Sequence, residues 1–235
     1  MMITVDQSEI KKHLLKNDFD VLKIKTSFDI KKIAADVSEV LASYGQIKKD
    51  KYEEYVGLGL QYSNEENPLY DAIPQFAYID QEGIVDKTRD SKIIFKKNAI
   101  GEKFSYIFEE FRSLIFFRGR ILTAKPNIKM SPHTDGEFIF NVHVPVFSNP
   151  QAKIFIDNKD YYLEPDGSLY VVNATKPHYI VNKSLTDRVH IIFTIGFLSF
   201  KNWTQVEVDD YVQKYSLQKH KEKLYQHNGL KLVDE

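Results

Sequence analysis

A series of short runs of β-branched and aromatic residues fills the second half of the chain from Ser113 onward. Proline, asparagine, aspartate and glycine separate the runs, as in the Pro-Asp-Gly of 165–167, and these residues favour tight turns. Short strands at this spacing are typical of an antiparallel sandwich or jelly roll. The runs are LIFFRGRILTA, FIFNVHVPVF, AKIFID, SLYVVN, HYIVN and RVHIIFTIGF.

Helical patterns flank this strand-rich half. Apolar residues recur at helical spacing over 30–44, opposite lysines and acids, and Gly45 follows as a stop signal. A second helix is predicted over 98–111, with Asn98 as its cap, and the lysine-rich pattern of 205–226 predicts a solvated helix. The predicted fold class is therefore mainly β with flanking helices.

The composition excludes several classes of protein. The formal net charge is −1 and no long stretch carries one sign, so the basic surface of a nucleic-acid-binding protein is not expected. The chain has no cysteines, which excludes disulfides, thiolate metal sites and cysteine nucleophiles. It lacks the apolar core of a signal peptide and any run of about 20 apolar residues that could span a membrane. We expect a soluble, cytoplasmic protein with neither a nucleic-acid nor a membrane partner, and the sequence carries no signal for its oligomeric state.

Three residues in the strand-rich half have the character of metal ligands. His133 and Asp135 lie two residues apart, a spacing that directs both side chains to one face of an extended segment. His178 begins a later strand. Composition alone often produces one His-x-Asp match, so the pair gains meaning only together with His178 and with Arg188, which opens the strand RVHIIFTIGF.

This set of residues predicts iron(II) chemistry with a 2-oxo acid. Two histidines and one carboxylate bind one side of a metal and leave open positions, the arrangement of non-haem iron(II) oxygenases. Zinc prefers a closed tetrahedral site or a single open position. If 2-oxoglutarate chelates the iron, its distal carboxylate needs a cation, and the planar guanidinium of Arg188 suits that role better than a lysine. We therefore expect Fe(II), 2-oxoglutarate as co-substrate and O2, with release of succinate and CO2.

Longer motifs surround these residues. They are RILTAKPNIKMSPHTD, NVHVPVFSNP, LEPDGSLYVVNATKPHYIVN and DRVHIIFTIGF. Through them the region from about 118 to 198 resembles the aspartyl/asparaginyl β-hydroxylase-like branch of the Fe(II)/2-oxoglutarate-dependent dioxygenases, which includes bacterial proline hydroxylases. The resemblance implies a double-stranded β-helix, a cupin-like jelly roll. It also implies these roles: iron at His133, Asp135 and His178, the distal carboxylate of 2-oxoglutarate at Arg188, and His143 near the co-substrate.

The resemblance also suggests how the chain is divided. We expect a single domain in which 1–111 forms a mixed helical and strand region packed on the barrel. The double-stranded β-helix core would occupy 112–200, and 201–235 would add a C-terminal helix.

Two positions depart from the family pattern. Asn127 replaces the usual glycine after a proline, a mild change because asparagine tolerates the turn conformations that glycine favours. Asn141 stands where many relatives have an arginine two residues before the histidine, which leaves open how a carboxylate of the substrate or co-substrate is bound. Arg120 and Asn141 are the candidate substrate-binding residues, although Arg120 could equally pair with an acid. His190 shares a strand face with Arg188, and we interpret it as structural.

The predicted function is hydroxylation of a small-molecule amino acid or a peptidyl residue, of proline, aspartate or asparagine type. The carboxylate at Asp135 makes the chain similar to the bacterial enzymes that act on free amino acids. It also disfavours halogenation, because it occupies the position that a halide would need. Two alternatives stay open. One is a non-catalytic jelly-roll protein that binds or senses metal. The other is metal-assisted hydrolysis, against which Arg188 argues because a hydrolase needs no remote carboxylate anchor.

Overall fold

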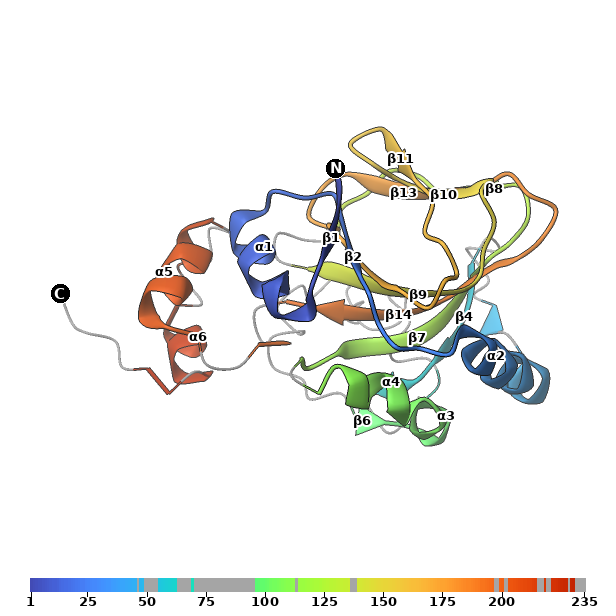
Figure 1. The fold of residues 1–235 in the computed structure, drawn as a ribbon, viewed down its shortest axis with the longest axis horizontal. Coiled ribbons are helices and arrows are strands. Elements are labelled where there is room, and N and C mark those ends of the chain that lie inside the picture. The colour runs from blue at the N-terminus through green and yellow to red at the C-terminus, as the bar shows by residue number, and fades with distance from the viewer. Residues whose placement is uncertain are drawn as a thin grey trace, which may run out of the picture.

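Two β-sheets face one another and form the centre of the molecule. The computed structural model describes residues 1–45, 47–48, 55–62, 69, 96–112, 114–135, 139–196, 199–200, 203–214, 218, 221–227 and 229–230. The larger sheet has eight strands and the smaller has four, and a separate pair joins β5 (Gln61–Tyr62) to β6 (Lys96–Lys97). Figure 1 shows the smaller sheet above the larger one, with helices below.

The larger sheet combines strands from both halves of the chain. Its order is β1-β2-β12-β9-β14-β7-β4-β3, and its pairs are antiparallel except for β1 with β2. The strands are β1 (Met2–Val5), β2 (Val21–Ile24), β3 (Ile47–Lys48), β4 (Tyr55–Gly59), β7 (Phe117–Ala124), β9 (Phe140–Phe147), β12 (Leu169–Val172) and β14 (Arg188–Ile195). The sheet therefore extends beyond the 112–200 segment that the sequence predicts for the core.

The smaller sheet closes the other side of the barrel. Its order is β11-β10-β13-β8, and all its pairs are antiparallel. Its strands are β8 (Ile128–Lys129), β10 (Ala152–Ile156), β11 (Lys159–Tyr161) and β13 (His178–Asn182). Asn127, just before β8, has φ 58°, so asparagine here adopts the left-handed conformation that glycine usually supplies. Two facing sheets of this kind confirm the predicted jelly roll.

Side chains of the central strands alternate between two cores. Val142 and Val144 of β9 and Ile191 of β14 belong to the larger apolar cluster, which includes apolar residues of the helices. Tyr170 and Val172 of β12 belong to a smaller cluster that also contains residues of the second sheet. This alternation leaves one face of β9 and β14 directed into the space between the sheets.

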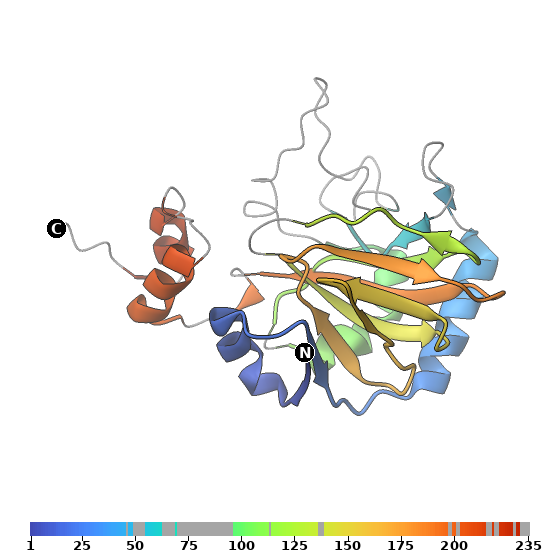
Figure 2. The same ribbon diagram turned by 90° about the horizontal axis from the view of Figure 1, so that it is seen from above.

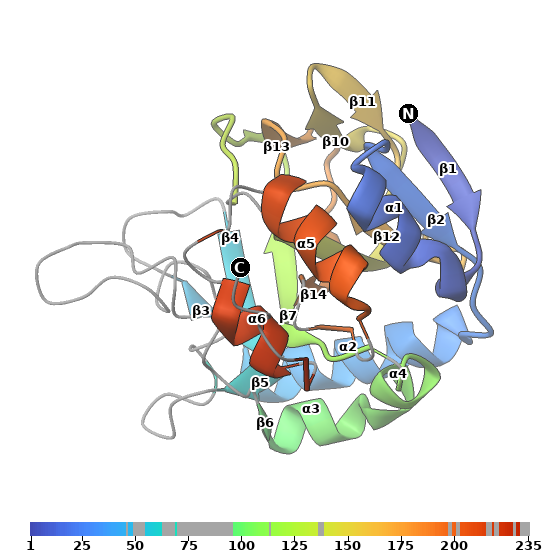
Figure 3. The ribbon, with the colours of Figure 1, turned by 90° about the vertical axis from the view of Figure 1, so that its left-hand side faces the viewer.

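Helices cover the outer face and one end of the larger sheet. In Figure 1, α2, α3 and α4 lie beneath this sheet. Figures 2 and 3 show α5 and α6 together at one end of the molecule, with α5 beside α1, where Lys11 Nζ lies 2.8 Å from a carboxylate oxygen of Glu207. The helices are α1 (Ile10–Lys16), α2 (Ile30–Tyr44), α3 (Ala99–Lys103), α4 (Ser105–Glu110), α5 (Gln205–Lys214) and α6 (Lys221–His227), with a short 3-10 turn at Gln7–Glu9.

The helix predicted over 30–44 is confirmed as α2. The Asp29 side chain accepts hydrogen bonds from the first backbone N–H groups of α2, and Gly45, at φ 69°, ends the helix. The helix predicted over 98–111 is divided at Phe104 into α3 and α4, although Asn98 caps it as expected by accepting from Gly101 N. The C-terminal part forms two helices where the sequence predicts one. None of the helices in the described part of the chain has the length and apolar character needed to cross a membrane.

Candidate metal centre

Backbone pairing brings His133, Asp135 and His178 together. His133 and His178 form an isolated antiparallel bridge, with N–O distances of 3.0 Å from His133 N to His178 O and 2.8 Å in the reverse direction. Asp135 N donates to Ala174 O at 3.0 Å, in the segment just before β13. Three backbone hydrogen bonds therefore hold the His-x-Asp segment against the start of β13.

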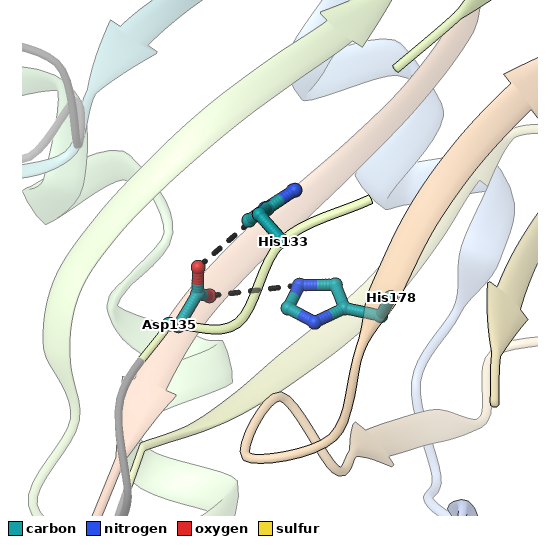
Figure 4. A group of neighbouring side chains, drawn as sticks. All are labelled: His133, Asp135 and His178. Atoms are coloured by element: carbon teal, nitrogen blue, oxygen red, sulfur yellow. Dashed lines mark ion pairs between the residues drawn. The ribbon is translucent and has the colours of Figure 1, made fainter. Parts of the chain in front are cut away.

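The three side chains converge on one point. Nε2 of His133 lies 3.6 Å from Oδ1 of Asp135, and Nε2 of His178 lies 3.8 Å from Oδ2. One ligand atom from each residue lies within 4.8 Å of the others, and Figure 4 shows the Asp135 carboxylate facing both imidazoles. Spacing of this kind lets a single metal ion contact all three groups.

Both histidines are oriented in the same way by the backbone. Nδ1 of His133 lies 3.0 Å from Ser131 O, and Nδ1 of His178 lies 3.0 Å from Lys176 O. A carbonyl oxygen only accepts, so each Nδ1 carries the proton and each Nε2 has a free lone pair toward Asp135. This second contact of each imidazole is usual for metal-binding histidines.

Exposure differs across the cluster. The side chain of His133 is 40% exposed, that of Asp135 29% and that of His178 6%. Burial lowers the pKa of His178, and the attraction of Asp135 opposes this only in part. Because His133 is the most exposed of the three, the cluster is reached from solvent on its side.

Arg188 and His143 lie on the same sheet, inside the barrel, and contact a third residue between them. Arg188 is 1% exposed, and its Nη2 lies 3.0 Å from Nδ1 of His190. Nδ1 of His143 lies 3.3 Å from the same atom. Burial and the guanidinium of Arg188 hold the pKa of both histidines well below its usual value, with Arg120 adding to the effect on His143. Both imidazoles are therefore neutral.

Arg120 lies across the sheet from His143. Ile192 of β14 pairs with His143 on one side and with Arg120 on the other. Arg120 is 4% exposed, and its Nη1 donates to the carbonyl of Arg118 at 2.8 Å. Asn141, expected to bind substrate, donates from Nδ2 to Oδ2 of Asp135 at 2.5 Å.

Sequence reasoning missed two features of this interior. The first is the contact of His190 with both Arg188 and His143; the signal available was the spacing of two residues along one strand. The second is Arg118, which is buried and has φ 53°, at the point where the register of β7 and β14 shifts. A bulge that redirects one residue leaves no mark in a pattern of apolar residues.

The residues present fit both groups that the chemistry requires. Two imidazole Nε2 atoms and one carboxylate make the donor set preferred by non-haem Fe(II). Beside the buried Arg188, the Nε2 atom of His190 is buried and has no hydrogen-bond partner among the residues that the structure describes. An unused donor next to a buried guanidinium suits a carboxylate such as that of 2-oxoglutarate.

Two histidines and a carboxylate in a jelly roll, with a buried arginine on the facing sheet, are the arrangement typical of non-haem Fe(II) oxygenases. Residues 103–196 match the family model of the aspartyl/asparaginyl β-hydroxylases. This match confirms the resemblance found in the sequence, and it supports an Fe(II)- and 2-oxoglutarate-dependent dioxygenase. Among curated proteins, none matches the chain.

Solved structures share the architecture at low sequence identity. HygX from Streptomyces hygroscopicus, determined with nickel and 2-oxoglutarate bound, aligns with a TM-score of 0.50 at 7% identity, over 82% of this chain and 87% of that one. An oxidoreductase of the 2OG-Fe(II) oxygenase family from Burkholderia pseudomallei aligns with a TM-score of 0.49 at 8% identity, over 83% of this chain and 94% of that one. At such identities the likeness to HygX shows a common fold.

Proposed function

We propose that this dioxygenase hydroxylates an unactivated C–H bond of an amino acid, free or within a peptide, of proline, aspartate or asparagine type. His133, Asp135 and His178 would hold the iron, and the observation that carries this proposal is their convergence within 4.8 Å. When bound, iron, 2-oxoglutarate and dioxygen supply the oxidising power for the hydroxylation and leave succinate and CO2. The protein holds the iron, the co-substrate and the substrate in position and excludes water from them.

Arg188 and His143 are proposed to bind 2-oxoglutarate. The guanidinium of Arg188 is permanently charged and almost completely buried, so a carboxylate placed against it gains an ion pair that water screens poorly. His143 is neutral, and its Nδ1 lies 3.3 Å from Nδ1 of His190, which places its ring beside the pair of Arg188 and His190. Both residues come from the central strands β9 and β14, which fix their positions more rigidly than loops would.

Arg120 is proposed to meet the carboxylate of the substrate. Arg120 is on β7 and His143 is on β9, and both are register partners of Ile192 on the intervening strand β14. A carboxylate bound at Arg120 would therefore be separate from one held by Arg188. A substrate with a free α-carboxylate or an acidic side chain fits this arrangement. Substrate binding by Asn141 stays a prediction.

A turnover screen tests the proposal. Purified protein is incubated with Fe(II), ascorbate, 2-oxoglutarate and each of a panel of free amino acids and short peptides, and succinate is measured. We expect succinate formation that depends on one substrate class, a hydroxylated product, and its loss in Asp135→Ala. The matched control is Asp187→Ala, which removes a partly exposed carboxylate paired with Lys125 and should keep wild-type turnover.

Two outcomes would contradict the proposal. Normal turnover in a folded Asp135→Ala variant would exclude Asp135 as a required ligand. Failure to form succinate with every substrate, in protein that still binds iron, would favour the non-catalytic alternative of a metal-binding or sensing jelly roll.

A further inference from the structure

Asn141 makes a direct contact with one of the three converging side chains. Its Nδ2 lies 2.5 Å from Oδ2 of Asp135, and the residue is 7% exposed. An amide N–H that donates to an ionised carboxylate forms a charge-assisted hydrogen bond, which is shorter and stronger than one between neutral groups. The contact joins the middle of the larger sheet to the segment that carries His133 and Asp135.

The sheet fixes the position of Asn141. It is the second residue of β9, and its register partners are Val172 on β12 and Thr194 on β14. With a paired strand on each side, its backbone cannot shift without breaking the sheet. The backbone that carries the Asn141 amide is therefore held in a fixed position inside the barrel.

Asp135 is held less firmly without this contact. Its backbone N–H is bound to Ala174 O, which fixes the main chain but leaves the carboxylate free to rotate about its side-chain bonds. The side chain is 29% exposed, so water competes for its oxygens. The amide of Asn141 engages Oδ2 and leaves Oδ1 at 3.6 Å from Nε2 of His133.

The chemistry of the donor matters as well as its position. An amide is neutral, so it orients the carboxylate without cancelling its charge, and the negative charge remains available to a metal cation. An arginine at this position would place a full positive charge next to Asp135 and compete with the metal for it. The neutral amide of Asn141 can therefore orient the Asp135 carboxylate and leave its negative charge available to a metal ion.

We propose that Asn141 is a positioning residue for the metal centre: it holds the Asp135 carboxylate in the orientation that binds the ion. This inference rests on the proposed ligand set of His133, Asp135 and His178. Neighbours that orient a metal ligand typically contribute 10- to 100-fold to metal affinity. Asn141→Leu removes the donor at similar volume and should weaken metal binding by roughly that factor.

The test measures metal binding directly, without turnover. Metal-free protein is titrated with Mn(II), and the dissociation constant is compared for the wild type, Asn141→Leu, Asn141→Ala and Asp135→Ala. The visible spectrum of the Co(II)-loaded protein reports the ligand geometry and should change in both Asn141 variants. The melting temperature of the metal-free protein shows that each variant is folded, and Asn141→Ala serves if the leucine does not fit.

Thr194→Val provides the matched control. Thr194 is the cross-strand partner of Asn141, it is equally buried, and its hydroxyl has no hydrogen-bond partner among the described residues. Replacing it perturbs the same row of the sheet without touching Asp135, so the Mn(II) affinity and Co(II) spectrum should stay as in the wild type.

The outcomes separate this inference from the function on which it rests. If Asp135→Ala binds Mn(II) as tightly as the wild type, the proposed ligand set is wrong. If Asp135→Ala loses affinity while folded Asn141 variants stay within about twofold of the wild type, the ligand set stands and the positioning role of Asn141 is overturned. Equal weakening in Thr194→Val would also overturn it, because the effect would then belong to the sheet and not to the amide.

Discussion

Nη2 of Arg188 lies 3.0 Å from Nδ1 of His190, and this contact determines which nitrogen of the imidazole carries the proton. A guanidinium only donates, so Nδ1 accepts, and the neutral ring must carry its proton on Nε2. That N–H is buried and has no acceptor among the residues described. His190 therefore both orients the guanidinium and offers a second donor beside it, which differs from the structural role expected from the sequence.

The first prediction concerns 2-oxoglutarate binding. His190→Leu removes the acceptor that orients Arg188 and the spare donor, so the affinity for 2-oxoglutarate should fall roughly tenfold, about 1.4 kcal/mol, as expected for hydrogen bonds to charged groups. Calorimetric titration of 2-oxoglutarate into Mn(II)-loaded protein measures the loss. Ile192→Val, two residues along the same strand face, is the control and should bind normally. Unchanged affinity in His190→Leu would restore the purely structural interpretation.

The pattern of strand-forming residues predicted the strands of the double-stranded β-helix core but not the full extent of the larger sheet. The runs beginning at His178 and Arg188 each became a strand with the expected first residue, because Pro177 and the Asn-Lys-Ser turn mark their limits. The pairing of β1 and β2 at the edge of β12 was not predicted. That edge depends on contacts between segments far apart in the chain, which no local pattern contains.

The convergence of His133, Asp135 and His178 could be predicted from sequence because their chemistry is unusual and their spacing is short or ordered. Asn141 and His190 could not be assigned in the same way, because asparagine and histidine occupy buried strands for many reasons. Their roles depend on register: which residue of β9 reaches Asp135, and which nitrogen of His190 reaches Arg188. Register is set by the assembled sheet and not by either strand alone.

The second prediction concerns pH. The pKa of His143 and of His190 lies well below the ordinary 6.5 in the folded protein, chiefly because both are buried. Below about pH 6.5 the unfolded chain therefore binds protons that the folded chain does not. The free energy of unfolding should be highest above that pH and should decrease as the pH falls below it, by about 1.4 kcal/mol per pH unit for each histidine.

Urea unfolding of metal-free protein from about pH 7.5 to 5.5 measures this dependence. His190→Leu removes one of the two groups, so its stability should fall less steeply with acidification than that of the wild type. The same slope in both proteins would show that His190 is not a neutral buried group.

The third prediction concerns metal-dependent stability. A ligand that binds only the folded state raises the free energy of unfolding, by about 2.7 kcal/mol at a concentration 100 times its dissociation constant. Mn(II) should therefore raise the melting temperature of the wild type, and a chelator should reverse the effect. His178→Ala should abolish the response, whereas His13→Ala, which removes a histidine of α1 that is paired with Asp18, should retain it. A full response in His178→Ala would remove His178 from the ligand set.

The fourth prediction concerns the buried carboxylate of Asp20, just before β2, which holds the segment leading to His178. Its Oδ1 accepts from Lys176 Nζ at 2.6 Å, and its backbone oxygen accepts from Asn173 N at 3.0 Å. The carbonyl of Lys176 is in turn the group that orients His178. Asp20→Ala leaves Lys176 with the Asp157 carboxylate, 3.9 Å away, and loosens this segment. The free energy of unfolding should fall by about 1.5 to 3 kcal/mol, as for the loss of a hydrogen bond to a charged group.

Because the released carbonyl orients His178, the Mn(II) affinity of Asp20→Ala should fall as well, by roughly tenfold if the loss resembles that of other groups that orient a ligand. Asp18→Ala is the control for both measurements. Asp18 lies two residues away, its side chain is 40% exposed, and it pairs with His13, so its loss should change stability by less than about 1 kcal/mol. Asp20→Ala with reduced stability and wild-type metal affinity would show that the N-terminal strands support the fold without orienting the metal centre.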